Sequence, residues 1–151
     1  MKSIILYYSR SGTTETLAQK IQSDLDIEAI KIEPKRKYGS YLSAVIRVMF
    51  EKLFGEQKSS TPAPDLSEYD TVFIGYPVWY QDLPSFVGEF LSRCDLRGKK
   101  IVPFASFGGS DVNYTLSTLQ EACPSAEIIY PYNNGMMKKG DYDRRISKFR
   151  S

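Results

Sequence analysis

The chain has 151 residues, of which 42% are hydrophobic and 13% aromatic, and its formal net charge is +2. This length suits one well-buried core, so we expect a single domain over residues 1–151. The absence of histidine argues against a transition-metal site, and the scattered positive charge argues against nucleic-acid binding. With no apolar run of membrane-spanning length and no signal-peptide pattern, we expect a cytoplasmic protein without a membrane span.

The first predicted strand, Ile4-Ile5-Leu6, is followed by a loop rich in hydroxyl side chains that opens a helix. The loop reads Ser9-Arg10-Ser11-Gly12-Thr13-Thr14, and the helix ends near Asp24. Free amides and the helix dipole favour an anion at such a position, and hydroxyl groups can donate further hydrogen bonds to phosphate oxygens. We predict a cradle for a terminal phosphate; the alternative is a loop that only caps the helix.

Three related phosphate motifs do not fit the chain. No G-x-x-x-x-G-K-[ST] run occurs, which excludes a nucleoside-triphosphate loop. A dinucleotide fingerprint needs G-x-G-x-x-G after the first strand, where Gly12 stands by itself. A thiol phosphatase needs a cysteine in the loop, whereas Cys94 and Cys123 lie far downstream. A mononucleotide or another phosphate ester remains as the expected ligand.

The rest of the chain alternates predicted strands and helices. In chain order these are a strand at 27–32, a helix at 41–54, a strand at 71–76, a helix after Pro84, a strand at 100–106, a helix opened by Ser110 or Asp111 and stopped by Pro124, a short strand at 127–130 and a helix at 141–149. The helix at 41–54 carries a wide apolar stripe that includes Ile46 and Met49, which is typical of core packing. Pro103 cannot donate to a sheet ladder, so we expect a bulge there or a later start of its strand.

Five strands separated by helical crossovers predict a three-layer α/β/α sandwich around a five-stranded parallel sheet. The first and third strands are the most apolar and belong in the centre, because parallel strands buried on both faces read as continuous apolar runs. The second and fifth strands are shorter or more polar and suit the edges. We therefore predict the strand order 2-1-3-4-5, with a ligand cleft at the switch point between the first and third strands.

The loops after the third and fourth strands should face this same cleft. The first loop contains Pro77-Val78-Trp79-Tyr80, an aromatic platform on which a flat heterocycle could stack. Alternatively, Trp79 covers the core or forms a partner interface. The second loop contains Ser106-Phe107-Gly108-Gly109, whose paired glycines suit either a close approach of the backbone to a ligand or a turn that needs positive φ.

The sequence resembles the flavodoxins, and most of all a shorter branch with a Y-Y-S-x-S-G-x-T opening and a G-x-P-x-W loop. The matching residues are Tyr7 to Thr14, then Gly75, Pro77 and Trp79, then Gly98-Lys99-Lys100, and Ser106 to Ser110. The resemblance spans nearly the whole chain in the right order. It implies non-covalently bound FMN, with the phosphate against Ser9, Arg10, Ser11, Gly12, Thr13 and Thr14. It also implies that the isoalloxazine ring lies between the Pro77–Tyr80 loop and the Ser106–Gly109 loop.

The same resemblance implies an electron carrier that serves a reductase and an acceptor protein and has no catalytic side chain of its own. The alternative is an FMN-dependent NAD(P)H:quinone or flavin reductase of the same fold, which would need an open face above the flavin. A flavin-free response regulator would need acidic residues where Tyr8-Ser9 and Tyr76-Pro77 stand. The chain is slightly basic, whereas the best-known flavodoxins are strongly acidic, which leaves the identity of the redox partners open.

Overall fold

The computed structural model describes residues 2–37, 41–54, 57–79, 82–106, 111–133 and 140–150. Its elements are β1 (Ser3–Tyr7), α1 (Thr13–Leu25), β2 (Glu28–Lys31), α2 (Tyr41–Phe54), β3 (Thr71–Pro77), α3 (Ser85–Ser92), β4 (Lys100–Ser106), the 3₁₀ turn η1 (Val112–Thr115), α4 (Leu116–Ala122), β5 (Glu127–Ile128), β6 (Tyr132–Asn133), α5 (Asp141–Ile146) and η2 (Ser147–Phe149). The strand order is β2-β1-β3-β4-β5, with every pairing between these strands parallel and β6 also beside β4. The predicted order is confirmed.

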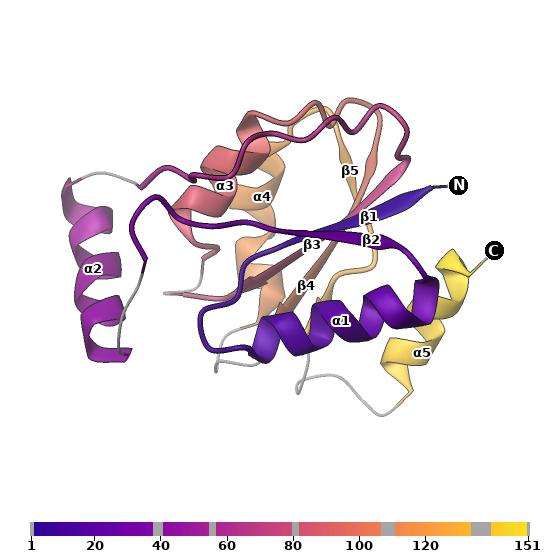
Figure 1. Ribbon diagram of the computed structural model, residues 1–151, viewed down its shortest axis with the longest axis horizontal. Coiled ribbons are helices and arrows are strands. Elements are labelled where there is room, and N and C mark those ends of the chain that lie inside the picture. The colour runs from indigo at the N-terminus through magenta and orange to yellow at the C-terminus, as the bar shows by residue number, and fades with distance from the viewer. Residues whose placement is uncertain are drawn as a thin grey trace.

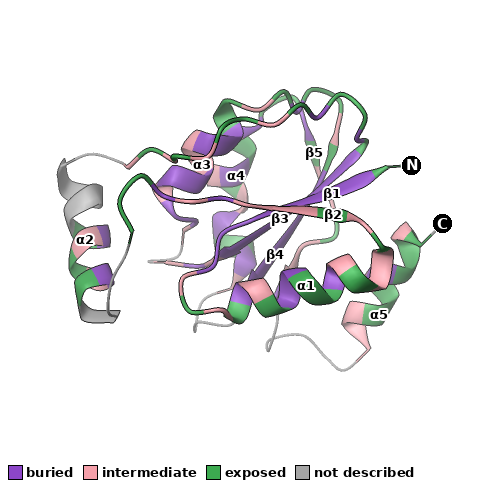
Figure 2. Cartoon of the chain, viewed as in Figure 1, coloured by how far each residue is buried: buried purple, intermediate pink, exposed green. Residues whose placement is uncertain are grey.

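Helices cover both faces of the sheet (Figure 1), as predicted for a three-layer fold. Successive residues of β1 point to opposite faces, because side chains alternate along a strand. Ile5 packs in a cluster with residues of α1 and α5, whereas Ile4 and Leu6 pack in a second cluster with residues of α3 and α4. Both central strands, β1 and β3, are buried on both faces (Figure 2).

Helix α2 is set apart from both helical layers and stands beyond the carboxyl end of β1 (Figure 1). Ala44 and Val48 are buried in the core cluster of α3 and α4, whereas Ile46 is 57% exposed and Met49 is 50% exposed. The prediction that the whole apolar stripe packs in the core is therefore wrong at Ile46 and Met49. The predicted stripe also included Val45, which is half-buried, whereas the buried Ala44 and Val48 lie outside that stripe. Among the α2 side chains that the structure describes, the helix therefore packs by another face than the predicted one.

Pro103 lies inside β4, without the later strand start that we considered. The carbonyl oxygen of Ile101 accepts a hydrogen bond from the amide of Ile129 at 2.8 Å, so the backbone N–H and C=O groups of Ile101 face β5. The backbone polar groups of alternate residues face the same neighbouring strand. The position at which Pro103 lacks an N–H donor therefore also faces β5. The neighbouring strand is interrupted there: β5 pairs with β4 up to Ile101, β6 resumes the pairing at Phe104, and Tyr130 between them has a φ of 47°. The predicted strand 127–130 therefore ends at Ile128, and β6 is a further short strand beyond the predicted range, which gives the described part of the sheet six strands instead of the predicted five.

Other predicted features of the fold concern caps and cysteines. Asp111, one of the two predicted caps, precedes η1 and accepts a hydrogen bond from the Asn113 amide at 2.9 Å through its Oδ1 atom. Burial raises the pKa of both the Cys94 and the Cys123 thiol to about 11, so both stay protonated at neutral pH. Within the described residues, no group of three or more potential ligands could hold a metal ion. Nor is any helix in this part of the chain long and apolar enough to cross a membrane.

Candidate functional site

The loops that follow β1 and β3 start side by side at the carboxyl edge of the sheet. Tyr7 pairs with Gly75, and the Tyr8 amide donates to the Gly75 carbonyl oxygen at 2.9 Å. From there α1 packs on one face of the sheet and α3 on the other. The two loops therefore diverge from neighbouring strands, as expected at a topological switch point.

The β1–α1 loop is shaped around Gly12, which precedes the first residue of α1. Gly12 has a φ of 97°, a left-handed conformation that residues with a Cβ atom rarely adopt. Its amide donates to the Ser9 hydroxyl at 3.0 Å, and its carbonyl oxygen accepts from the Thr16 amide at 2.9 Å. As a glycine, Gly12 offers no side chain to cap the amides of the first helical turn. The positive end of α1 is thus formed by backbone rather than by a capping side chain.

The predicted phosphate residues divide into two groups by burial. Ser9 and Thr14 are buried, Arg10 and Gly12 are half-buried, and Ser11 and Thr13 are exposed. A Cβ atom built on Gly12 would meet nothing within 4 Å. A cavity of about 710 Å³ reaches Ser11, Gly12 and Thr13 at one end and extends along α1 to Tyr142 and Asp143 of α5. The loop therefore has open space beside its exposed hydroxyl groups and its helix N-terminus, which fits an anionic phosphate ester.

The one carboxylate in the first turn of α1 is held at the side of the helix. Glu15 accepts a hydrogen bond from the Tyr7 hydroxyl at 3.1 Å and lies 3.8 Å from the ammonium group of Lys31 on β2. Burial, together with Glu15, raises the pKa of Tyr7 to about 12, so this hydroxyl remains a donor at neutral pH. Glu15 is thus partnered by β1 and β2, which limits its repulsion of an anion at the loop.

The β3 loop carries the aromatic residue singled out in the sequence. Backbone hydrogen bonds join Trp79 and Asp82 in both directions, at 2.7 and 2.9 Å. The half-buried Trp79 ring meets the Tyr8 ring edge-on at 5.8 Å, and Tyr8 in turn meets Phe86 at 4.6 Å. The indole is therefore anchored to the core through Tyr8, which agrees with the alternative that Trp79 covers the core.

Not every predicted ring-site residue is described. Pro77 is half-buried, Val78 is buried, and Ser106, the last residue of β4, is in register with Pro77. The β3 and β4 loops therefore begin next to each other, as the strand order requires. The remaining four predicted residues, Tyr80, Phe107, Gly108 and Gly109, lie outside the described residues.

A buried hydrogen bond joins the carboxyl end of β3 to η1, the 3₁₀ turn that follows the β4 loop. The hydroxyl of Tyr76 lies 2.7 Å from Thr115 Oγ1, and both residues are fully buried. Thr115 Oγ1 donates its own proton to the carbonyl oxygen of Val112 at 2.6 Å, so Tyr76 must be the donor of the first bond. Burial raises the pKa of Tyr76, which keeps this hydroxyl protonated.

We expect Tyr76→Phe to lower the free energy of unfolding by about 1 kcal/mol, because the Thr115 oxygen loses its buried donor. Urea denaturation of the apoprotein measures this loss. Thr115→Val removes the same bond from the other side, so the two losses should be less than additive in the double variant. Strictly additive losses would show that the hydrogen bond between Tyr76 and Thr115 does not contribute to the stability of the fold.

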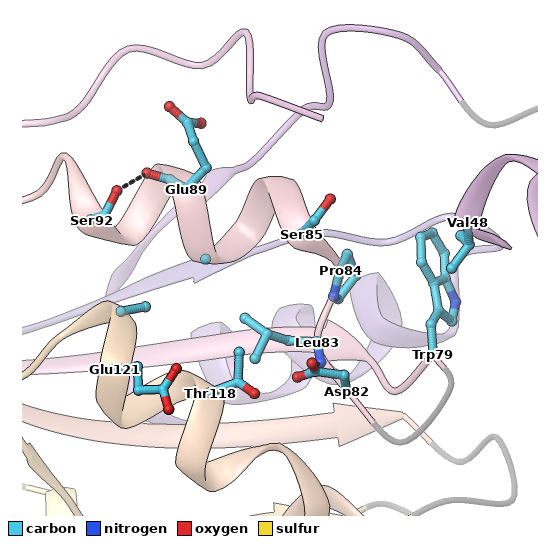
Figure 3. Close-up of a pocket in the computed structure, with 12 residues that line it drawn as sticks. Val48, Trp79, Asp82, Leu83, Pro84, Ser85, Glu89, Ser92, Thr118 and Glu121 are labelled. Carbon is cyan, nitrogen blue, oxygen red and sulfur yellow. Dashed lines mark hydrogen bonds between the residues drawn. The ribbon is translucent and has the colours of Figure 1, made fainter. Parts of the chain in front are cut away.

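Sequence reasoning also missed a cavity of about 460 Å³ between α2, α3 and α4 (Figure 3). Trp79 and Val48 lie at one end of it, Glu121 lies toward the other end, and Asp82 lies between them. Its walls come from segments far apart in the chain, so no local motif signals it. The cavity brings Val48 of α2 and Trp79 of the β3 loop into one site.

Three features together define a flavodoxin-like fold. They are a parallel sheet of order 2-1-3-4-5, a loop after β1 that is rich in hydroxyl side chains and turns at Gly12, and an aromatic loop after β3. The family model described as flavodoxin matches residues 2–147, and the chain belongs to the flavodoxin family. The resemblance read from the sequence is thereby confirmed.

Solved structures share this fold along almost the whole chain. A protein from Bacteroides eggerthii assigned as a flavoprotein is 24% identical with a TM-score of 0.84, over 98% of this chain and 97% of that one. A flavoprotein from Lactobacillus acidophilus, crystallised in complex with FMN, is 22% identical with a TM-score of 0.74 over the same shares of each chain. A curated relative, an NAD(P)H dehydrogenase (quinone) from Acidovorax ebreus, is 28% identical over 92 residues, which is 61% of this chain and only 46% of that protein.

Proposed function

We propose that the chain, as one domain over residues 1–151, binds FMN and passes electrons between redox partner proteins. Flavodoxin-family membership and the relative crystallised with FMN support FMN as the cofactor. The observation that carries the proposal is the β1–α1 loop, where open space adjoins an exposed helix N-terminus and two exposed hydroxyl groups. The two free cysteines support a reducing compartment such as the cytoplasm as its location.

In this proposal the loop Ser9–Thr14 holds the phosphate of FMN. The amides of the first turn of α1 and the exposed hydroxyl groups of Ser11 and Thr13 would donate to it, while the buried Ser9 side chain fixes the turn at Gly12. Pro77–Tyr80 and Ser106–Gly109 would flank the ring. The bound flavin would supply the redox chemistry, and the protein would bind and orient it and limit its access to water.

The carrier role predicts how the loaded protein responds to NADPH. Since a carrier needs a separate reductase, we expect NADPH alone to leave the flavin absorbance almost unchanged in an anaerobic stopped-flow experiment. Dithionite should bleach the same sample, which shows that the flavin is accessible to electrons. A redox titration should resolve two one-electron steps. Rapid bleaching by NADPH alone would contradict the carrier role.

An NAD(P)H:quinone or flavin reductase is the second candidate, and the Acidovorax ebreus relative favours it. The matched segment is less than half of that protein, so more than half of it has no counterpart in the alignment. A reductase would also turn over quinone with NADPH in the steady state. Turnover of a quinone with no added partner protein would establish this second candidate and overturn the first.

A further inference from the structure

The outer face of α2 exposes large apolar side chains beside the proposed cofactor site. Ile46 and Met49 are three residues apart and so share one side of the helix, and both are at least half exposed. The opposite side of α2 contributes Val48 to the cavity that also contains Trp79 (Figure 3). One helix, about 10 Å across, therefore separates the exposed apolar pair from the Trp79 loop.

The chain enters and leaves α2 through a short two-stranded stalk, residues 34–36 against 57–59. The Lys35 amide donates to the Lys58 carbonyl oxygen at 2.9 Å, the Arg36 amide donates to the Gln57 side chain at 2.5 Å, and Pro34 bridges to Ser59. The stalk explains how α2 can stand away from the sheet. It also gathers exposed cations at the base of the helix, because Lys35, Arg36 and Lys58 are all exposed.

Several basic side chains without an ion-pair partner gather around α2. In the described segments, the basic side chains of Lys35, Arg36, Lys37 and Arg47 have no carboxylate within ion-pair distance. Several other surface cations are paired with carboxylates: Lys2 with Glu68, Lys20 with Asp24, Arg93 with Glu89, Arg97 with Asp95 and Arg144 with Asp141. Exposed Lys100 and Lys148, far from α2 in the chain, are also outside any ion pair in the described segments. The α2 region therefore combines an exposed apolar pair with a surplus of positive charge.

The positive charge around α2 indicates which kind of partner can bind this surface. A twofold dimer formed through the same patch would bring its surplus of positive charge against itself, which is unfavourable. The carboxylates of Asp82 and Glu121 do not offset this charge, because they lie on the α3–α4 side of Trp79 (Figure 3). We propose that Ile46, Met49 and the surrounding basic residues form a docking surface for an acidic redox protein. The inference rests on the proposed electron-carrier function and names the charge of its partner.

Cytochrome c and its succinylated form provide matched probes, because both carry the same haem while succinylation replaces lysine ammonium groups with carboxylates. The FMN-loaded protein is reduced anaerobically and mixed with each cytochrome in a stopped-flow instrument. We expect the succinylated form to be reduced about 10-fold faster at low ionic strength, as for electrostatically steered encounters. Added salt should lower that rate, because it screens the attraction, and should raise the rate for native cytochrome c.

Two matched charge reversals locate the surface. Lys35→Glu should lower the rate with succinylated cytochrome c about threefold and flatten its salt dependence. Lys148→Glu makes the same charge change on the exposed end of the chain near α5 and should alter the rate much less. The double variant Ile46→Ser/Met49→Ser should weaken complex formation without changing the salt dependence, since it removes apolar contact but no charge.

The outcomes separate the docking surface from the underlying function. Equal rates for the two cytochromes, or equal effects of Lys35→Glu and Lys148→Glu, would overturn the docking surface while FMN binding stands. Failure of the reduced protein to pass electrons to either cytochrome would overturn both the carrier function and the partner. A homodimer in sedimentation that Ile46→Ser/Met49→Ser dissociates would overturn the proposal in favour of a second copy of the chain.

Discussion

Replacing Ser11 with aspartate should abolish most FMN binding and leave the fold intact. A carboxylate beside a phosphate dianion costs about 3 kcal/mol at the dielectric of a partly exposed site, which corresponds to a roughly 100-fold rise in Kd. Riboflavin lacks the phosphate, so its Kd should stay within about twofold. Quenching of flavin fluorescence on binding measures both constants.

The stability of the Ser11→Asp apoprotein provides the first control. Ser11 is exposed just before α1, where a negative charge interacts favourably with the helix dipole, so the free energy of unfolding should be unchanged or slightly higher. Ser11→Asn, which matches aspartate in size without its charge, should retain most of the FMN affinity. Parallel losses of FMN and riboflavin in Ser11→Asp would show that the phosphate does not lie at this loop.

The second large effect concerns the fold, at Gly75 in the centre of the sheet. Gly75 is in register with Phe104 across β3 and β4, and a Cβ atom on it would lie 2.3 Å from two ring atoms of Phe104. Phe104 is only 1% exposed, so its ring has little room to move. We expect Gly75→Ala to lower the free energy of unfolding by about 3 kcal/mol, the upper range for overpacking, as measured by urea denaturation.

Gly88→Ala is the matched control, with the same change of one methyl group. Gly88 lies inside α3, and a Cβ atom there would meet only Leu83 Cδ1, at 3.8 Å. Alanine is favoured over glycine in a helix by about 1 kcal/mol, so this variant should be more stable than the wild type. A Gly75→Ala protein as stable as the wild type would contradict the close packing of Phe104 on β3.

Much of the fold could be predicted because it depends on local patterns that the sequence states directly. The apolar runs at Ile4–Leu6 and Thr71–Tyr76 identify the two central strands, since only strands buried on both faces lack alternation. Once β1 and β3 are neighbours, topology alone places the loop at Ser9–Thr14 beside the one at Pro77–Tyr80. The strand order alone therefore predicts where the candidate site lies.

The features that escaped prediction depend on long-range contacts. An apolar stripe indicates that α2 has a face to bury, but among its described side chains the buried ones are Ala44 and Val48, which lie outside that stripe. The interruption between β5 and β6 likewise arises across the sheet, from the missing donor of Pro103. The contact between Tyr8 and Trp79 joins residues more than sixty positions apart, and no local spacing encodes it.

Calorimetric titration of the apoprotein with FMN and with riboflavin tests most directly whether the β1–α1 loop holds a phosphate. If it does, FMN should bind at least about 100-fold more tightly than riboflavin, because two or more charge-assisted hydrogen bonds to the phosphate contribute about 3 kcal/mol. Equal dissociation constants for the two flavins, or no heat on addition of FMN, would contradict the account.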